Sequence, residues 1–372
     1  MKGDRSSTRF AATYSQRRDS SRGRTPVPQA SKGDSTRCIR HHNVWAGALD
    51  EVSLRDPCYE ELQIRAQQRA EANGSSAEHP MKMAKIAVLG DLHGRWDDWD
   101  VDYFDRSDYE LLLFTGDLGS GTGEAGVKIA RSIARLAKPA LVMPGNNDVE
   151  FQPAISAEFL HQRGLIDLLD STALERRRSV SHSSGRVALC GYSLHPLTLS
   201  CGDLTVLAGR PHSMGGPTLS FPDDLQRNHG IPSLEESTTR LIELVNSVPT
   251  RDLIVLSHNG PFGLGSSPTD IWGCDFKEGG GDWGDPDLRA AIDHAREVGK
   301  RVRAVVAGHM HLVTREGESR TERVTTEGTL HLNAARVPRI FAGPEGAIRS
   351  HMSLEISEQH LSARELSIPS DR

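Results

Sequence analysis

The segment Ile86–Gly94 reads Ile-Ala-Val-Leu-Gly-Asp-Leu-His-Gly, a wholly apolar run that leads into an acidic residue and a histidine. Four further segments repeat the arrangement, with an apolar run, a glycine or serine, and then a side chain of a metal-binding type. They are Leu111–Gly119, Ala140–Asp148, Leu253–Pro261 and Ala304–His311. Short runs that are apolar at every position predict strands buried on both faces. Functional groups gather beyond the carboxyl ends of strands in an open α/β sheet, so we expect the five loops to share one crevice.

In order and spacing, these loops resemble the signature of the calcineurin-like metallophosphoesterase family. That signature is Gly-Asp-x-His, Gly-Asp-x-x, Gly-Asn-His-Asp/Glu, a Ser-His pair and Gly-His-x-His, and the resemblance spans roughly residues 85–339. It implies an α/β fold, a four-layer α/β/β/α sandwich of two facing mixed sheets with a metal centre along one edge. Segments 263–270, 280–287 and 333–339 further resemble a subgroup found mainly in cyanobacteria and plants.

The resemblance also implies two divalent metal ions and a set of ligands for each. The first ion would be held by Asp91, His93, Asp117 and His311. The second would be held by Asp117, Asn146, His258 and His309, so that Asp117 bridges the two ions. Oxygen and nitrogen ligands without a thiolate suit manganese, iron, zinc or nickel (Mn, Fe, Zn or Ni). Two such ions about 3.5–4 Å apart hold a bridging hydroxide and neutralise charge on a phosphoryl group.

The spacing of these ligands allows them to converge, although each has a purely structural alternative. Residues two apart in an extended segment point the same way, so Asp91 can converge with His93, and His309 with His311. An aspartate after a strand can instead cap a helix, and a buried histidine can hydrogen-bond the backbone. Five matches in the right order, each at a predicted strand end, favour the metal site over these alternatives.

Asn147 departs from the family signature, which has a histidine at this position. In relatives that histidine contacts the scissile phosphate and protonates the leaving group. A general acid of this kind raises the reaction rate about 10²–10⁴-fold. Asparagine donates hydrogen bonds but delivers no proton in this pH range. We therefore take Asn147 and Asp148 as catalytic candidates. We expect the site to favour substrates that are esters with good leaving groups, or diesters whose cleavage is assisted by a residue elsewhere. The alternative acids are His195, His212 and His229, unless they are loop histidines without a catalytic role.

Arginine and tryptophan side chains supply the candidates for substrate binding. Arg336, with Arg339, follows the strand after the Gly-His-Met-His loop, and Arg210 lies in a glycine-rich segment. A bidentate arginine is a good phosphate clamp, whereas the alternative for each is a surface salt bridge. Trp272 and Trp283 are candidates for an apolar wall against a base or an aryl group, with core packing as the alternative.

Charge and composition restrict the function further. The net charge is −6, but residues 1–40 contain ten lysines and arginines and three aspartates, so the remainder carries −13. An acidic catalytic domain repels polyanions, which counts against a nuclease and favours a small-molecule phosphoester as the partner. No segment approaches the roughly 20 apolar residues of a membrane span, and none has the pattern of a secretory signal. Five cysteines without Cys-x-x-Cys spacing indicate neither a disulfide framework nor a structural zinc site, so we expect a cytoplasmic protein.

Two regions are expected along the chain. Residues 1–80 are rich in serine, arginine and glycine, so we expect a disordered basic extension with at most a short helix at residues 59–72. This extension is either an organellar transit peptide, which would place the protein in a plastid, or a stretch ahead of a true start at Met81 or Met83. Residues 81–372 form the metallophosphoesterase domain, with a specificity insertion at about 192–249 that could cover the crevice.

Local patterns predict several further elements. Apolar periodicity predicts helices at residues 124–136 and 157–169, and short apolar runs predict strands of a second sheet at 186–190 and 204–207. Ser233–Glu236 has the pattern of a capping box, and Leu241, Leu244 and Val245 give the following helix a buried face. Asp285 is expected to cap a helix that runs through Val298.

The sequence therefore predicts a dinuclear metal-dependent phosphoric ester hydrolase, acting on phosphate mono- or diesters of small-molecule or nucleotide type. Two alternatives stay open. One is a nuclease, and the other is a catalytically weak metal-binding scaffold of the same fold, which the asparagine at position 147 keeps under consideration.

Overall fold

The structure, a computed structural model, describes residues 82–120, 123–159, 187–344 and 346–370. Within these residues the strands form two sheets, with the order β11-β12-β1-β2-β3-β4 and β13 beside β12 in one, and β5-β6-β7-β8-β10-β9 in the other. The helix predicted at residues 59–72 lies outside the described residues. Of the helix predicted at residues 157–169, only residues 157–159 are described, and they belong to a helix that begins at residue 152.

The first sheet contains β1 (Ala84–Leu89), β2 (Leu111–Phe114), β3 (Ala140–Val142), β4 (Val187–Leu189), β11 (Ile340–Gly343), β12 (Gly346–Ile356) and β13 (Leu361–Ser370). The second contains β5 (Ser193–Leu199), β6 (Gly202–Ala208), β7 (Asp252–Leu256), β8 (Arg301–Ala307), β9 (Arg323–Thr326) and β10 (Thr329–Asn333). The described residues include the helices α2 (Asp98–Arg106), α3 (Gly123–Ile133), α6 (Pro222–His229), α7 (Leu234–Asn246), α8 (Pro286–Glu297) and the 3₁₀ helix η1 (Asn146–Phe151).

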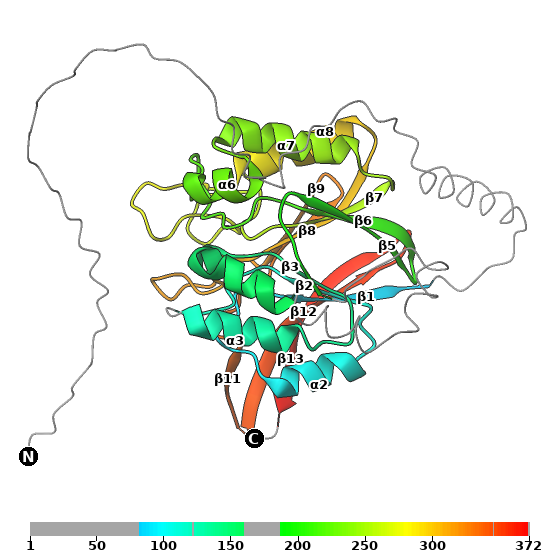
Figure 1. Cartoon of the computed structure of the whole chain (residues 1–372), viewed down its shortest axis with the longest axis vertical. Coiled ribbons are helices and arrows are strands. Elements are labelled where there is room, and N and C mark those ends of the chain that lie inside the picture. The colour runs from blue at the N-terminus through cyan, green and yellow to red at the C-terminus, as the bar shows by residue number, and fades with distance from the viewer. Residues whose placement is uncertain (1–81, 121–122, 160–186, 345, 371–372) are drawn as a thin grey trace, which may run out of the picture. The chain divides into compact units, whose positions relative to one another are not determined.

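Apolar side chains on both faces of the central strands explain why these strands stack in four layers. In β1, Ile86 and Val88 join the core between the two sheets, whereas Ala87 and Leu89 pack beneath α2 and α3. In β7, Ile254 joins the same inter-sheet core, and the alternate residues pack beneath α7 and α8. Each fully buried valine, leucine or isoleucine contributes about 1.5–3 kcal/mol. Figure 1 shows α7 and α8 on one outer face and α2 and α3 on the other, which confirms the predicted α/β/β/α sandwich.

Both sheets are mixed, and their parallel strands point the functional loops toward one edge. β1, β2, β3 and β4 run parallel, as do β6, β7, β8 and β10, while β12, β5 and β9 pair antiparallel at the flanks. The five apolar runs predicted as strands are therefore β1, β2, β3, β7 and β8. Their carboxyl ends carry the loops that the sequence singles out.

The strand predicted at residues 186–190 lies in a different sheet from the one expected. β4 pairs with β3 in parallel, from Ala140 beside Val187 to Val142 beside Leu189, so it extends the first sheet. Val187 packs into the apolar cluster beneath α3. The prediction of a second-sheet strand was correct for residues 204–207, which lie in β6.

Residues 192–249 contain β5 and β6 of the second sheet, together with α6 and α7. Ser233 begins α7 as predicted, because its Oγ accepts the Glu236 N–H at 3.2 Å. Leu241 and Val245 of this helix are fully buried. Asp285 precedes α8, but its carboxylate does not cap that helix, which corrects the sequence-based expectation. The side chain instead pairs with Arg210 at 2.7 Å.

Two further observations concern the described residues alone. No helix among them combines the length and the apolar character that crossing a membrane requires. Cys190, Cys201 and Cys274 are free thiols, and two of them are buried.

Candidate functional site

Seven predicted metal ligands lie in loops that follow parallel strands of both sheets. Asp91 and His93 follow β1, Asp117 follows β2, and Asn146 opens η1 after β3. His258 follows β7, and His309 and His311 follow β8. Since the first three strands belong to one sheet and the last two to the other, the site lies where the edges of the two sheets meet.

One group of donors consists of Asp91, His93 and His311. Their ligand atoms all lie within 4.8 Å of one another. The Nε2 atoms of His93 and His311 are 3.2 Å apart, and His311 Nε2 is 3.5 Å from Asp91 Oδ2. These three side chains can hold a metal ion.

A second group of donors lies around His258, and Asp117 lies between the two groups. Asp117 Oδ2 is 3.8 Å from His93 Nε2, and Asp117 Oδ1 is 3.6 Å from His258 Nε2. His258 Nε2 lies 2.9 Å from Asn146 Oδ1, and the His258 and His309 rings are 5.1 Å apart between centroids. The structure therefore brings all seven predicted ligands together.

The donor geometry around His258 fits a cation. His258 Nδ1 donates to the Thr115 carbonyl oxygen at 2.6 Å, so when the ring is neutral its lone pair is on Nε2. That lone pair faces the amide oxygen of Asn146, which is also an acceptor. Two acceptors this close repel each other unless a proton on Nε2 or a metal ion lies between them. Metal–ligand bonds of about 2.0–2.2 Å place neighbouring ligand atoms roughly 3 Å apart, in agreement with these separations.

Two glycines of the motifs are required because ligand side chains lie against their Cα atoms. A Cβ on Gly308 would lie 2.2 Å from Asp91 Oδ1, and a Cβ on Gly145 would lie 2.2 Å from Asp117 Oδ1. Both distances are far shorter than any real contact. The glycine in Gly-His-Met-His and the glycine in Gly-Asn-Asn-Asp thus make room for a carboxylate contributed by another loop.

Three of the ligand residues adopt a left-handed backbone conformation that non-glycine residues rarely adopt. The φ angles are 43° for His93, 51° for Asp117 and 66° for His309. Such conformations cost of order 1–3 kcal/mol each and concentrate at functional sites. His93 is held in this conformation by its N–H, which donates to the Asp117 carbonyl oxygen at 2.8 Å.

The ionisation of Asp91 and His309 favours the forms that bind metal, whereas His258 and His311 have to release any bound proton before they can ligate an ion. Burial opposes the charge on Asp91, but the hydrogen bond with His311 and the charge of His258 outweigh burial and hold its pKa below the usual range. Burial lowers the pKa of His309 to about 3, so this ring is neutral at pH 7. Burial alone would lower the pKa of His258, yet the Asp117 and Asp91 carboxylates raise it. Ionised carboxylates and neutral imidazoles are the forms that ligate metals.

The two catalytic candidates differ in their access to the site. Asn147 is exposed, and its backbone N–H and its Nδ2 donate to Asp117 at 2.8 Å and 2.6 Å. Asp148 is buried and accepts the N–H groups of Gly145 at 2.8 Å and Leu118 at 3.0 Å. Burial, reinforced by the charge of Asp117, raises the pKa of Asp148 to about 7. Asp148 thus holds two ligand loops together from beneath.

The arginines proposed as phosphate clamps are not brought to the ligands. Arg210 has no exposed side-chain surface and pairs with Asp285 at 2.7 Å and Asp287 at 3.0 Å. Arg336 pairs with Glu365 of β13 in a bidentate contact, with Nε and Nη2 donating to the two carboxylate oxygens. The buried Arg339 donates to Asp100 at 2.9 Å. All three side chains form salt bridges, but only that of Arg336 is at the surface, because Arg210 and Arg339 are buried.

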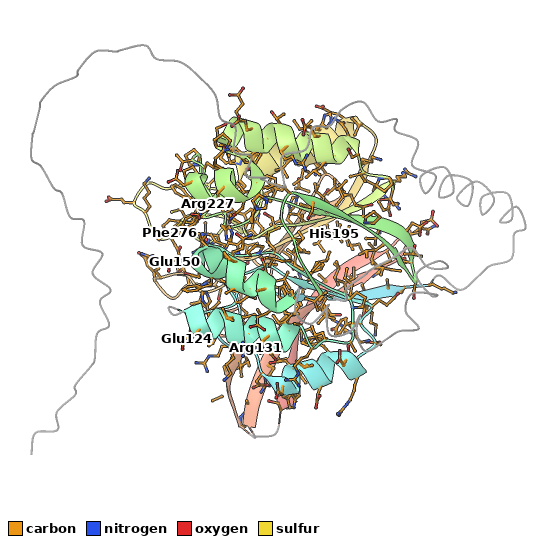
Figure 2. The ribbon with its side chains drawn as sticks, viewed as in Figure 1. Glu124, Arg131, Glu150, His195, Arg227 and Phe276 are labelled. Atoms are coloured by element: carbon orange, nitrogen blue, oxygen red, sulfur yellow. The ribbon has the colours of Figure 1, made fainter. Side chains whose placement is uncertain are left out.

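The three histidines considered as alternative acids also lie apart from the ligands. His195, on β5, has its Nε2 2.9 Å from Ser193 Oγ, and Figure 2 shows it well away from Phe276, a residue of the site pocket. His212 donates from Nδ1 to the Gly145 carbonyl oxygen at 2.7 Å, so it supports the loop that carries Asn146. His229 ends α6 and packs against the Tyr192 ring.

The tryptophans proposed as an apolar wall do not line the pocket. Trp272 is fully buried, and its ring lies where a Cβ on Gly260 would be. Trp283 packs in the same apolar cluster as Trp272. Core packing, the alternative considered for both, agrees with the structure.

A pocket of about 270 Å³ opens over the ligands. Its floor is formed by His93, Asp117, Asn146, Asn147, His309 and His311. Its wall is formed by Asp275, Phe276, Met310, Val313 and Arg315. Sequence reasoning missed Phe276 and Arg315. The one available signal was the position of Arg315, four residues beyond His311 in the same loop.

Comparison with known proteins gives one match at the level of family. A sequence model of the calcineurin-like phosphoesterases matches residues 84–313. No curated protein matches the chain. Similar solved structures include TT1561 of Thermus thermophilus, with 11% identity, a TM-score of 0.43, and coverage of 76% of this chain and 98% of that one. They also include GAP50, the anchor in the inner membrane complex of Plasmodium, with 11% identity, a TM-score of 0.41, and coverage of 77% and 85%. A metallophosphoesterase of Sphaerobacter thermophilus has 12% identity, a TM-score of 0.26, and coverage of 76% and 88%. With TM-scores this low, the solved structures carry no functional argument, whereas the family match covers more than half of the chain.

Proposed function

The chain belongs to the calcineurin-like phosphoesterase family, and from this premise we propose that it hydrolyses phosphate mono- or diesters of small molecules with two bound divalent metal ions. One observation carries the proposal. Seven oxygen and nitrogen donors converge beneath an open pocket, and Asp117 contacts both groups of donors through different oxygens. Manganese, iron, zinc and nickel suit these donors.

Bound ions of this kind neutralise charge on the phosphoryl oxygens and lower the pKa of a coordinated water. The side chains of the chain then position the ester. Asn147 is exposed in the pocket floor and can donate a hydrogen bond to a phosphoryl oxygen. It cannot transfer a proton near neutral pH, so the leaving group has to depart without protonation by this residue. We therefore propose that esters with good leaving groups are the preferred substrates.

The rival functions make different demands on the same pocket. A nuclease would need to attract a polyanion, yet residues 41–372 carry a net charge of −13. A scaffold would bind metal without turnover, and the exposed pocket over the ligands argues against it. We also propose that the chain belongs to a subgroup found mainly in cyanobacteria and plants, which segments 263–270, 280–287 and 333–339 resemble.

The proposal is tested by reconstituting chelator-treated protein with manganese, iron, zinc or nickel, and by measuring hydrolysis of a substrate panel. The panel contains 4-nitrophenyl phosphate, bis(4-nitrophenyl) phosphate, cyclic nucleotides and sugar phosphates. Asp91→Asn is the inactive comparison, and Asp98→Asn, an exposed carboxylate on α2, is its matched control. We expect turnover by the wild type and by Asp98→Asn. If both stay at the Asp91→Asn level with every metal, the scaffold alternative replaces the proposal.

A further inference from the structure

The pocket wall, which is the part of the lining outside the metal ligands and Asn147, is built by two loops. Asp275 and Phe276 belong to the long loop between β7 and α8, and Met310, Val313 and Arg315 belong to the loop that follows β8. Arg315 is the one cationic side chain among the described residues that line this pocket. Figure 2 shows Phe276 on the same side of the molecule as Glu150 of η1, the helix that Asn146 opens.

The guanidinium of Arg315 is available for an anion. Its Cζ lies 5.6 Å from the centroid of the Phe276 ring, and the residue is exposed. No carboxylate in the described part of the chain forms an ion pair with it, whereas Arg320 in the same loop pairs with Asp275. A planar guanidinium presents paired N–H groups that match two oxygens of a phosphoryl group.

The backbone that carries Arg315 is fixed relative to a metal ligand. The Arg315 N–H donates to Asp275 Oδ2 at 2.9 Å, and the fully buried Arg320 lies 3.3 Å from the other oxygen of that carboxylate. Arg320 Nε also donates to the carbonyl oxygen of His311 at 2.9 Å. A single buried side chain therefore links the wall to the ligand His311, so the position of the wall is set before substrate binds.

The Phe276 ring provides a rigid support for the guanidinium. It meets the Trp283 ring edge to face, with centroids 5.6 Å apart and planes at 86°. The stacking of Arg315 over this ring is a cation–π contact. Val313 adds an exposed apolar surface beside it, with 52% of the residue accessible. Apolar surroundings strengthen the attraction between a guanidinium and an anion.

We infer that Arg315, supported by Phe276, binds the phosphoryl group of the substrate and makes the pocket selective for monoesters. This inference rests on the proposed function, because it assigns a substrate class to the same pocket. A phosphate monoester has three non-bridging oxygens and two negative charges near neutral pH, whereas a diester has two oxygens and one charge. When two oxygens face the metal ligands, only a monoester retains a third oxygen for Arg315.

The test compares two substrates with the same leaving group, 4-nitrophenyl phosphate and bis(4-nitrophenyl) phosphate. Arg315→Met removes the charge, and Arg315→Lys retains it without the paired N–H groups. Arg251→Met is the matched control, because Arg251 is exposed and precedes β7, at the opposite end of that strand from His258. A second readout, independent of turnover, is calorimetric titration of the metal-loaded protein with inorganic phosphate. Metal content is measured for each variant.

Loss of a charged hydrogen bond predicts at least about a tenfold fall in kcat/KM for the monoester and a similar weakening of phosphate binding in Arg315→Met. The diester should change less than about threefold, Arg315→Lys should be intermediate, and metal content should stay the same. Equal losses for both esters, or unchanged phosphate binding, overturn the inference. If the wild type hydrolyses neither these esters nor any other member of the substrate panel, the proposed function fails, and the phosphate titration alone decides the role of Arg315.

Discussion

The imidazoles of His93 and His311 face each other with 3.2 Å between their Nε2 atoms, although 218 residues separate them along the chain. His93 follows β1 of the seven-stranded sheet, and His311 follows β8 of the six-stranded sheet. The donors of one cluster thus come from both sheets. Since the unfolded chain does not hold these donors together, any metal bound at the site stabilises the whole sandwich.

The position of Asp117 between the two donor groups predicts how its loss will affect metal binding. Asp117→Asn should weaken both sites, because the carboxylate contacts His93 on one side and His258 on the other. His93→Ala should weaken mainly one site. Elemental analysis after gel filtration measures ions per chain for each variant, with Asp98→Asn as an exposed-carboxylate control. Near-full occupancy of both sites in Asp117→Asn would contradict the bridging role.

The asparagine at position 147 predicts a dependence on the leaving group. Asn147→His should supply a general acid, which raises the rate about 10²–10⁴-fold when the leaving group needs a proton. The ratio of alkyl to aryl ester turnover should therefore rise at least about tenfold. Steady-state rates for an alkyl and an aryl monoester give this ratio, and Asn147→Gln is the control without a titratable group. If the wild type already cleaves alkyl esters efficiently and the ratio does not change, another residue provides the proton.

The buried ion pair of Arg210 predicts a large effect on stability. Arg210→Met leaves Asp285 and Asp287 buried without a cationic partner, which costs about 3–5 kcal/mol of unfolding free energy. Arg227→Met is the matched control, because its pair with Asp224 is at the surface and is worth about 0–1 kcal/mol. Urea denaturation measures the unfolding free energy of both variants. A difference between the two variants below about 1 kcal/mol would show that the buried pair has been overvalued.

Buried His351 on β12 predicts that stability falls as the pH decreases. Burial, with the charge of Arg339, lowers its pKa to about 3 from an ordinary value of 6.5. Between these values the unfolded chain binds a proton that the folded chain does not, so stability is complete above pH 6.5 and declines below it. The decline is at most about 1.4 kcal/mol per pH unit for this group.

Urea denaturation at pH 7 and pH 5 tests the role of this histidine. The Tyr109 hydroxyl is 2.8 Å from the histidine Nε2, and His351→Gln keeps a hydrogen-bonding group near it. Between pH 7 and pH 5, the unfolding free energy of this variant should fall less than that of the wild type. Exposed His360→Gln should behave like the wild type. The same pH dependence in all three proteins would assign the effect to other groups.

The central strands and the ligand loops could be predicted from sequence because their signals are local. β1 and β7 are buried on both faces, so every residue of the runs Ile86–Leu89 and Leu253–Leu256 is apolar. β13 is largely half-exposed and reads Leu-Ser-Ala-Arg-Glu-Leu-Ser-Ile-Pro-Ser, which carries no comparable pattern. The sheet to which β4 belongs depends on pairing with β3, and three residues contain no information about their partner.

The site was predictable for its ligands but not for its wall. Asp91, His93 and the other donors lie in short motifs whose chemistry is visible in sequence. The roles of Arg210 and Arg315 depend instead on distant partners. Arg210 is buried because Asp285 and Asp287 surround its guanidinium, and Arg315 is available because the ring of Phe276 supports it. These contacts form only when separate loops meet in the folded chain.

The most direct test of a two-metal phosphoesterase is a titration of activity against bound metal. Chelator-treated protein receives increasing amounts of Mn²⁺, and each sample is assayed with 4-nitrophenyl phosphate while bound ions per chain are determined. The two groups of donors that meet at Asp117 predict a rate that stays near background without metal and reaches its plateau when two ions are bound. Full activity without metal, or no hydrolysis with two ions bound, would contradict the proposed function.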